Sequence, residues 1–168
     1  MVYLKFVIRK MRKDDIPHVQ HIAQTSWNYT YEGMIPRKVQ DSFLKSAYND
    51  EMMKKRLESS LILVVENKSE LVGFANFSPV KEDGEAELLA IYLHPRYYGN
   101  GVGTALLNEG IKALKGVKKL FVNVEKENRI GSIFYKAKGF TVASEFDDDF
   151  QGYTLKTVQL VLYVYFLL

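Results

Sequence analysis

Three glycines at alternate positions, Gly99, Gly101 and Gly103, follow an apolar run and precede a segment with the apolar spacing of a helix. Glycine lets the backbone turn tightly and come close to a ligand. The free amides and the positive dipole end of a helix N-terminus favour an anion. On spacing alone, two interpretations stand side by side: a loop that holds a pyrophosphate, and a glycine-rich turn that only starts a helix.

Two better-known phosphate loops do not match this segment. A dinucleotide-binding loop has the spacing Gly-x-Gly-x-x-Gly after an early strand, whereas here the glycines alternate and follow a predicted hairpin. A P-loop continues from its last glycine to Lys and then Ser or Thr, but Thr104 follows Gly103 directly.

The composition is that of a globular protein and excludes several kinds of chemistry. The chain has 168 residues, of which 47% are hydrophobic and 26% charged, and it has no cysteine. This length predicts a single domain over residues 1–168. Disulfides, thiolate metal ligands and an acyl-cysteine intermediate are excluded. The net charge is +3, with Lys and Arg spread along the chain, so we expect no nucleic-acid partner.

Neither end of the chain has the pattern of a membrane segment. The first residues alternate charged and apolar side chains and lack the apolar block of a signal peptide. The most apolar stretch, 160–168, has only half of the roughly 20 residues that a spanning helix needs, and it predicts a buried strand. We therefore expect a cytoplasmic protein without a membrane partner.

Apolar periodicity, together with Gly and Pro punctuation, predicts a mixed sheet with helices on its faces. The predicted strands are 2–10, 61–66, 71–77, 85–93, 119–125, 140–146 and 154–165. The predicted helices are 14–29, 36–47, 50–59, 102–115 and 128–138.

The glycine segment resembles the coenzyme A loop of the GCN5-related N-acetyltransferases, the GNAT family, whose pattern is Gln/Arg-x-x-Gly-x-Gly/Ala. Gly101 and Gly103 match the two glycines of that pattern. Tyr98 departs from it, because the family usually has Gln or Arg at this position. The segment that carries the resemblance runs from Leu89 to Leu107.

A second motif of the same family follows in the expected order. Asn128 opens a predicted helix, Tyr135 lies seven positions later, and the pair Gly139-Phe140 comes after it. The order of predicted elements is also similar over essentially the whole chain. The resemblance implies an α/β fold, GNAT-like, with about seven strands in a mixed, splayed sheet and four to five helices.

The resemblance also implies that acetyl-CoA is the cosubstrate of an N-acetyltransferase. In this family the strand before the loop splays from its neighbour, and its unpaired backbone groups bind the pantetheine arm and polarise the thioester carbonyl. The implied coenzyme-binding residues are Ile91, Tyr92, Leu93, Tyr98, Gly99, Asn100, Gly101, Val102, Gly103, Thr104, Asn128 and Tyr135. With no cysteine in the chain, the amine attacks acetyl-CoA directly.

Two side chains are candidates for proton transfer. The resemblance assigns Tyr135 as the acid that protonates the leaving thiolate, and the alternative is an aromatic ring that packs its helix on the sheet. An alkylammonium with a pKa near 10 must lose a proton before it attacks. Glu87, at the start of the splayed strand, is the candidate base, with Glu85 on the same face. An ordered water as the base, with Glu87 merely solvated, is the alternative.

The acceptor is expected to be a small amine. The stretch 27–33 resembles a branch of the family that includes microbial spermidine and spermine acetyltransferases. Aromatic faces and carboxylates suit a polycation, so Trp27, Tyr31 and Glu85 are the predicted substrate-binding residues. Two acidic stretches, 82–87 and 145–149, are expected in loops on the acceptor side.

Other functions remain open at this point. A protein N-terminus or a lysine side chain is an alternative acceptor, and a non-catalytic acyl-CoA sensor is an alternative of another class. The three histidines, His18, His21 and His94, have no spacing typical of a metal site, so no metal is expected. We expect a monomer or a homodimer.

Overall fold

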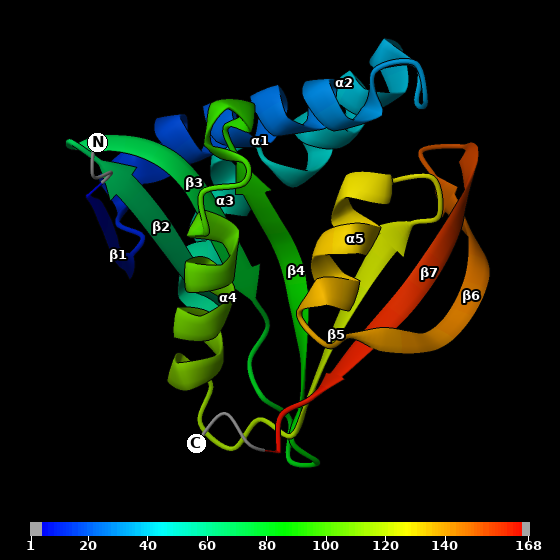
Figure 1. Cartoon of the computed structure of the whole chain (residues 1–168). Coiled ribbons are helices and arrows are strands. Elements are labelled where there is room, and N and C mark those ends of the chain that lie inside the picture. Colours follow the sequence, from blue (N-terminus) through cyan, green and yellow to red (C-terminus); the bar gives the residue numbers. More distant parts are fainter. Residues whose placement is uncertain (1–4, 166–168) are drawn as a thin grey trace.

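The computed structural model describes residues 5–165 and contains a seven-stranded mixed sheet with helices on both faces (Figure 1). The strand order across the sheet is β1-β2-β3-β4-β5-β7-β6. The strands are β1 (Phe6–Lys10), β2 (Leu61–Asn67), β3 (Glu70–Phe77), β4 (Glu85–Leu93), β5 (Lys119–Glu125), β6 (Thr141–Phe150) and β7 (Tyr153–Tyr163). The predicted mixed sheet is therefore confirmed.

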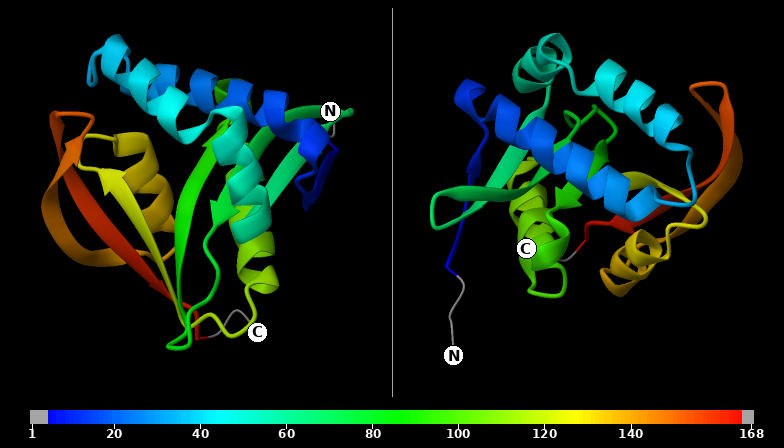
Figure 2. Two further views of the ribbon diagram at one scale, coloured as in Figure 1. Left: turned by 180° about the vertical axis from the view of Figure 1, so that it is seen from behind. Right: turned by 90° about the horizontal axis from the view of Figure 1, so that it is seen from above.

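Five α-helices are divided between the two faces of the sheet. They are α1 (Ile16–Tyr31), α2 (Arg37–Ala47), α3 (Asp50–Ser59), α4 (Val102–Ala113) and α5 (Arg129–Ala137), and short 3-10 turns span Lys13–Asp15 and Pro95–Tyr97. Helices α4 and α5 lie on the face turned to the viewer in Figure 1, and α1, α2 and α3 lie on the opposite face (Figure 2).

Local sequence explains where several helices begin. The Asn49 side chain accepts a hydrogen bond from the backbone N–H of Met52 and caps α3. Asn128 does the same for α5, accepting from the backbone N–H of Gly131 at 2.9 Å. Proline in the first turn starts α1, where its missing N–H removes no helix bond.

The ladder between the two central strands of the sheet, β4 and β5, is short. Strands β4 and β5 run parallel and pair only at Glu85↔Lys119, Ala86↔Leu120 and Glu87↔Phe121, whereas the other neighbours are antiparallel. Beyond Glu87, residues 88–93 of β4 and 122–125 of β5 are not paired with each other, and the two strands diverge like the arms of a V (Figure 1). We call this gap in the backbone pairing the opening. The predicted splay is therefore present.

A β-bulge in β4 changes which side chains face which layer. Asn76 of β3 pairs with Ala90 and Phe77 pairs with Leu88, so Leu89 is the extra residue. Leu88 packs in the core cluster that contains α4, whereas Ala90 packs in the cluster that contains α1. Leu89 is 43% exposed on the strand between them.

Element ends differ modestly from the sequence predictions. The first strand begins at Phe6 rather than at residue 2, and residues 2–4 lie outside the described residues. The last strand ends at Tyr163 rather than at 165. The predicted buried strand over 160–168 is confirmed at Leu160–Leu162, and 166–168 lie outside the described residues.

The prediction that the acidic stretches lie in loops is correct for Glu82 and Asp83, which belong to the turn before β4, and wrong for the rest. Glu85 and Glu87 belong to β4, and 145–149 belong to β6, which pairs with β7 along its length up to Phe150↔Tyr153. Three consecutive Asp residues disfavour a strand by propensity, but the ladder with β7 satisfies their backbone groups and extends the hairpin. None of the helices within residues 5–165 combines the length and apolar character needed to cross a bilayer.

Candidate active site

The glycine loop connects the open end of β4 to the N-terminus of α4. Gly99 and Gly101 have φ values of 79° and 78°, in the left-handed region that favours glycine. A Cβ atom at either position would meet nothing within 4 Å, so the space beside the loop is open. The first hydrogen bond of α4 runs from the Ala105 N–H to the Gly101 carbonyl, so the amides of residues 102–104 precede the bonded turns. The loop therefore fits a phosphate group.

Tyr98 and Gly103 shape the two sides of this loop. The Tyr98 ring packs edge-on against Tyr29 of α1, with ring centroids 5.8 Å apart, and brings no positive charge. Gly103 lies so close to α5 that a Cβ atom there would be 3.2 Å from the Phe134 ring. Gly103 thus brings α4 and α5 together beside the opening of the sheet.

Three predicted coenzyme residues lie on the unpaired part of β4. Residues Ile91, Tyr92 and Leu93 pair with β3 on one edge, and their other edge faces the V-shaped opening towards β5. Backbone N–H and C=O groups on this edge are therefore available to an extended ligand. A ligand arm that entered here would have its phosphate end at the glycine loop, because β4 leads directly into that loop.

Tyr135 is buried at the α5 side of the opening. It is 8% exposed, and its ring contacts Phe134 and Phe140 with centroid separations of 5.4 and 5.5 Å. Burial raises the pKa of its hydroxyl well above the ordinary range, and the charge of Glu125 adds to that rise. The phenol therefore stays protonated at neutral pH and is able to donate its proton only when a strong base forms beside it. Packing and proton donation are both compatible with this position.

Glu87 is partly buried at the closed end of the opening. It is the last residue of β4 that pairs with β5, and its backbone N–H donates to the Ser78 hydroxyl at 2.8 Å. Burial raises the pKa of its carboxyl, and the charge of Lys81 opposes that rise. Glu85 lies further from the opening, at the start of β4, where it pairs with Lys119.

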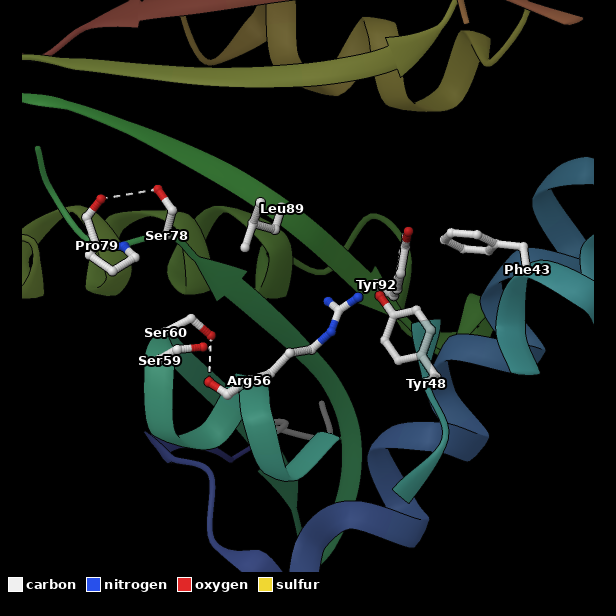
Figure 3. Close-up of a pocket in the computed structure, with 9 residues that line it drawn as sticks. All are labelled: Phe43, Tyr48, Arg56, Ser59, Ser60, Ser78, Pro79, Leu89 and Tyr92. Carbon is white, nitrogen blue, oxygen red and sulfur yellow. Dashed lines mark hydrogen bonds between the residues drawn. The ribbon is translucent and has the colours of Figure 1, made fainter. Parts of the chain in front are cut away.

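A pocket of about 390 Å³ opens beside β4 on the face covered by α2 and α3 (Figure 3). Its lining consists of aromatic, apolar and hydroxyl side chains with a single cation: Phe43, Tyr48, Arg56, Ser59, Ser60, Ser78, Pro79, Leu89 and Tyr92. The Arg56 guanidinium lies 4.7 Å from the Tyr48 ring centroid and donates to Asn76 Oδ1 at 3.1 Å. Among residues 5–165, no carboxylate forms an ion pair with Arg56.

A hydrogen-bonded cluster joins α1 to both strands of the opening. Trp27 Nε1 donates to the Tyr92 hydroxyl at 2.9 Å, and the Tyr31 hydroxyl donates to the carboxylate of Glu125. The Trp27 ring is stacked on Phe150 at 5.6 Å and also contacts Phe43, so aromatic neighbours occupy its faces.

Glu125 is the member of this cluster that the sequence analysis missed. It ends β5, and burial raises the pKa of its carboxyl, while the hydrogen bond from Tyr31 opposes that rise. Its sequence context, an acidic residue at the end of an alternating strand, is typical of a solvated position. Only its distance of three residues from Asn128 could have indicated that it lies near the site.

The structure thus brings together most of the predicted site residues around the opening of the sheet. The glycine loop, the free edge of β4, Tyr135 and the aromatic residues Trp27 and Tyr31 surround it, whereas Glu85 does not reach it. Within residues 5–165, no group of three or more His, Asp or Glu side chains is arranged to hold a metal ion.

A mixed sheet that splays between two central strands, with a glycine loop at the start of the next helix, defines the architecture of acetyl-CoA-dependent acyltransferases. Residues 18–140 match the family model described as the acetyltransferase (GNAT) family. The chain belongs to this family, and it is an acetyl-CoA-dependent N-acetyltransferase.

Two curated relatives and one solved structure agree with this assignment. The chain is 30% identical to a spermidine N(1)-acetyltransferase of Thermoplasma acidophilum, over 85% of this chain and 92% of that protein. It is also 30% identical to YuaI of Bacillus subtilis, an uncharacterized N-acetyltransferase, over 91% of this chain and 90% of that protein. The crystal structure of the PaiA N-acetyltransferase from T. acidophilum in complex with coenzyme A superposes with a TM-score of 0.83 at 26% identity, covering 93% of this chain and 98% of that one.

Proposed function

We propose that this enzyme acetylates a small polyamine such as spermidine or spermine on a primary amine. The observation that carries the proposal is the unpaired edge of β4 beyond Glu87: this strand leads into the glycine loop, and two of its residues, Leu89 and Tyr92, also line the pocket on the face covered by α2 and α3. Coenzyme and acceptor then reach the same strand from two sides. Because the chain has no cysteine, the acetyl group passes directly to the amine.

Acetyl-CoA supplies the activated acetyl group, and the residues of this chain would hold it along a continuous path. The amides of 102–104 and the open space at Gly99 and Gly101 suit the pyrophosphate. The free edge of β4 at Ile91, Tyr92 and Leu93 suits the pantetheine arm. Of the remaining predicted members, Tyr98 and Asn100 belong to the glycine loop segment, and Asn128 caps α5.

Of the two predicted proton-transfer roles, that of Tyr135 fits the surroundings of its side chain better than that of Glu87. Tyr135 is protonated at neutral pH and lies on the coenzyme side of the sheet, where a leaving thiolate forms. Glu87 remains the base predicted from the sequence. Glu87 lies where β4 and β5 are still paired, at the closed end of the opening. A proton acceptor at the wider end, between 88–93 and 122–125, would have to be another residue.

Two observations favour a polyamine as the acceptor: the name of one relative, and the distribution of charged side chains on the acceptor face. The T. acidophilum relative at 30% identity is a spermidine N(1)-acetyltransferase. Acidic side chains line the exposed strand β6, and the charge of Asp148 acts on Glu125. Arg56 makes the α3 end of the acceptor face positive, so a polycation would extend from the reaction centre towards β6 and away from Arg56.

The test is a panel of acceptors assayed with acetyl-CoA while release of free CoA is followed. Spermidine, a monoamine of similar length, a single amino acid and a lysine-bearing peptide are compared at low and high salt. We expect the highest kcat/KM for spermidine and a decline of that value with salt. Equal values for spermidine and the monoamine, or a preference for the peptide, would exclude the polyamine. Release of CoA with none of the amines would favour a non-catalytic acyl-CoA sensor.

A further inference from the structure

Glu125 lies across the opening from the part of β4 where the thioester is expected. The parallel ladder ends at Glu87↔Phe121, and counting four residues along both strands from this pair reaches Ile91 and Glu125. The bulge at Leu89 adds one residue to β4 and brings Tyr92 to the same level. The charge of Glu125 acts on the hydroxyls of both Tyr92 and Tyr135, which places all three around one centre.

The side chain of Glu125 is on the acceptor face of the sheet. Val122 and Val124 pack in the core cluster that contains α4, so side-chain alternation turns Glu125 to the opposite face. Its hydrogen bond with Tyr31 of α1 agrees with this orientation, because α1 covers that face. A coenzyme arm on one side and an amine on the other would both come next to this carboxylate.

The surroundings of Glu125 supply a hydrogen bond but no cation. Within the described part of the chain, no Lys, Arg or His side chain forms an ion pair with it. Its carboxylate accepts hydrogen bonds from the Tyr31 hydroxyl and from its own backbone N–H, and the charge of Asp148 from β6 acts on it. The charge of Glu125 in turn acts on the hydroxyls of Tyr92 from β4 and Tyr135 from α5. A partly buried carboxylate without a cationic partner is costly to a fold unless a ligand supplies the positive charge.

We propose that Glu125 binds the attacking ammonium group of the acceptor and takes the proton that this group must lose. This role rests on the proposed transfer to an amine and assigns the proton acceptor to β5 rather than to Glu87. Burial supports it, because a raised carboxyl pKa makes Glu125 a stronger base than a solvated glutamate. Tyr31 is the positioning residue that holds the carboxylate towards the opening.

The step balances with the groups at hand. The ammonium gives one proton to Glu125 and becomes a neutral amine, whose nitrogen forms a bond to the acetyl carbon while the bond from that carbon to the CoA sulfur breaks. The nitrogen loses its second proton as the amide forms, and the sulfur gains one from Tyr135, whose hydroxyl is restored by that second proton. The proton on Glu125 passes to solvent, so the products are the acetylated amine, CoA and one proton.

The test compares the pH profiles of Glu125→Gln and of the wild type with an amine that the wild type acetylates. Gln keeps an oxygen for Tyr31 but cannot take a proton. We expect kcat/KM to fall by about 10²-fold at neutral pH, and the loss to shrink at high pH where the amine deprotonates without help. Affinity for acetyl-CoA should stay the same. Glu125→Asp, which keeps the carboxylate, should retain the acid limb of the profile with lower activity.

Matched variants separate this role from its alternatives. Glu127→Gln removes an exposed carboxylate two residues away and should match the wild type. A Glu125→Gln profile that parallels the wild type at every pH overturns the proposal, and so does loss of the acid limb in Glu87→Gln but not in Glu125→Gln. A wild type that acetylates no amine in the panel removes the proposed function together with this role, whereas turnover that is insensitive to Glu125→Gln removes this role alone.

Discussion

The hydroxyl of Tyr31 donates a hydrogen bond to the carboxylate of Glu125 and ties the end of α1 to the end of β5. These residues are 94 positions apart in the chain. The bond stabilises the charged form of Glu125 and so lowers the pKa of a carboxyl that burial raises.

Replacing Tyr31 by Phe should therefore raise the pKa of Glu125 further. The acid limb of kcat/KM should move to higher pH, because a larger fraction of Glu125 is protonated at a given pH. Tyr29→Phe is the matched control, since Tyr29 is exposed on the same helix. If the acid limb of the kcat/KM profile has the same pKa in Tyr31→Phe as in the wild type, Glu125 is not the group whose protonation causes that limb.

Gly101→Glu should weaken acetyl-CoA binding by about 10²-fold, because a like charge beside the pyrophosphate costs roughly 3 kcal/mol. Gly116→Glu is the control: Gly116 has the same positive φ and the same open space around Cβ, but lies beyond the far end of α4. Backbone strain and added charge are thus matched. Calorimetry that shows equal affinities for the two variants would remove the loop from the coenzyme site.

Tyr135→Phe should lower kcat by about 10²-fold, within the usual range for the loss of a general acid, with little change in CoA affinity. The ring and its contacts with Phe134 and Phe140 remain. Tyr163→Phe, at an exposed position at the end of β7, should have wild-type kcat. If kcat were unchanged in Tyr135→Phe, the residue would have a packing role only.

Arg56→Met should raise kcat/KM for spermidine several-fold, because the change removes a positive charge from the acceptor side of β4. Lys54→Met makes the same charge change at an exposed position of α3 and should have little effect. The opposite result, a loss of activity confined to acceptors that carry a carboxylate, would show that the pocket binds an anionic group and that the acceptor is not a polyamine.

Asp15→Asn should destabilise the fold by about 2 kcal/mol and lower Tm by about 6 °C, because Asp15 accepts two hydrogen bonds from Arg9, at 2.8 and 2.9 Å. The Arg9 hydrogen bond is the main cause that lowers the pKa of Asp15. A lowered pKa means that this stabilisation is present above the ordinary aspartate pKa and is lost as the pH falls through the lowered value.

The difference in stability between wild type and Asp15→Asn should therefore be largest at neutral pH and shrink on acidification. Thermal unfolding at several pH values measures it. Asp14→Asn, at the exposed neighbouring position, should leave Tm unchanged. A difference that does not depend on pH would mean that packing, rather than the charged pair, explains the loss.

Features that depend only on residues close together in the sequence could be predicted. The glycine loop, the cap at Asn128 and the strand alternation each depend on residues that are close together in the chain, and the structure places these elements as expected. The splay of β4 from β5 followed from the family resemblance, because no local pattern marks where a ladder ends.

Features that depend on distant contacts could not be predicted. Glu125 owes its burial and its hydrogen bond to α1, which no pattern around β5 reveals. The acidic stretch 145–149 was expected in a loop from the family resemblance, yet it belongs to β6 and pairs with β7. The bulge at Leu89 is likewise a property of the β3–β4 register and not of either strand alone.

The short ladder between β4 and β5 has a consequence for solubility. Two strands in the middle of the sheet carry rows of unpaired N–H and C=O groups, the pattern that normally occurs only at the border of a sheet and that promotes pairing with foreign strands. A coenzyme arm along β4 would cover one of these rows. The cosubstrate would then protect the protein from aggregation, so its cellular concentration would influence how long the folded enzyme survives as well as how fast it works.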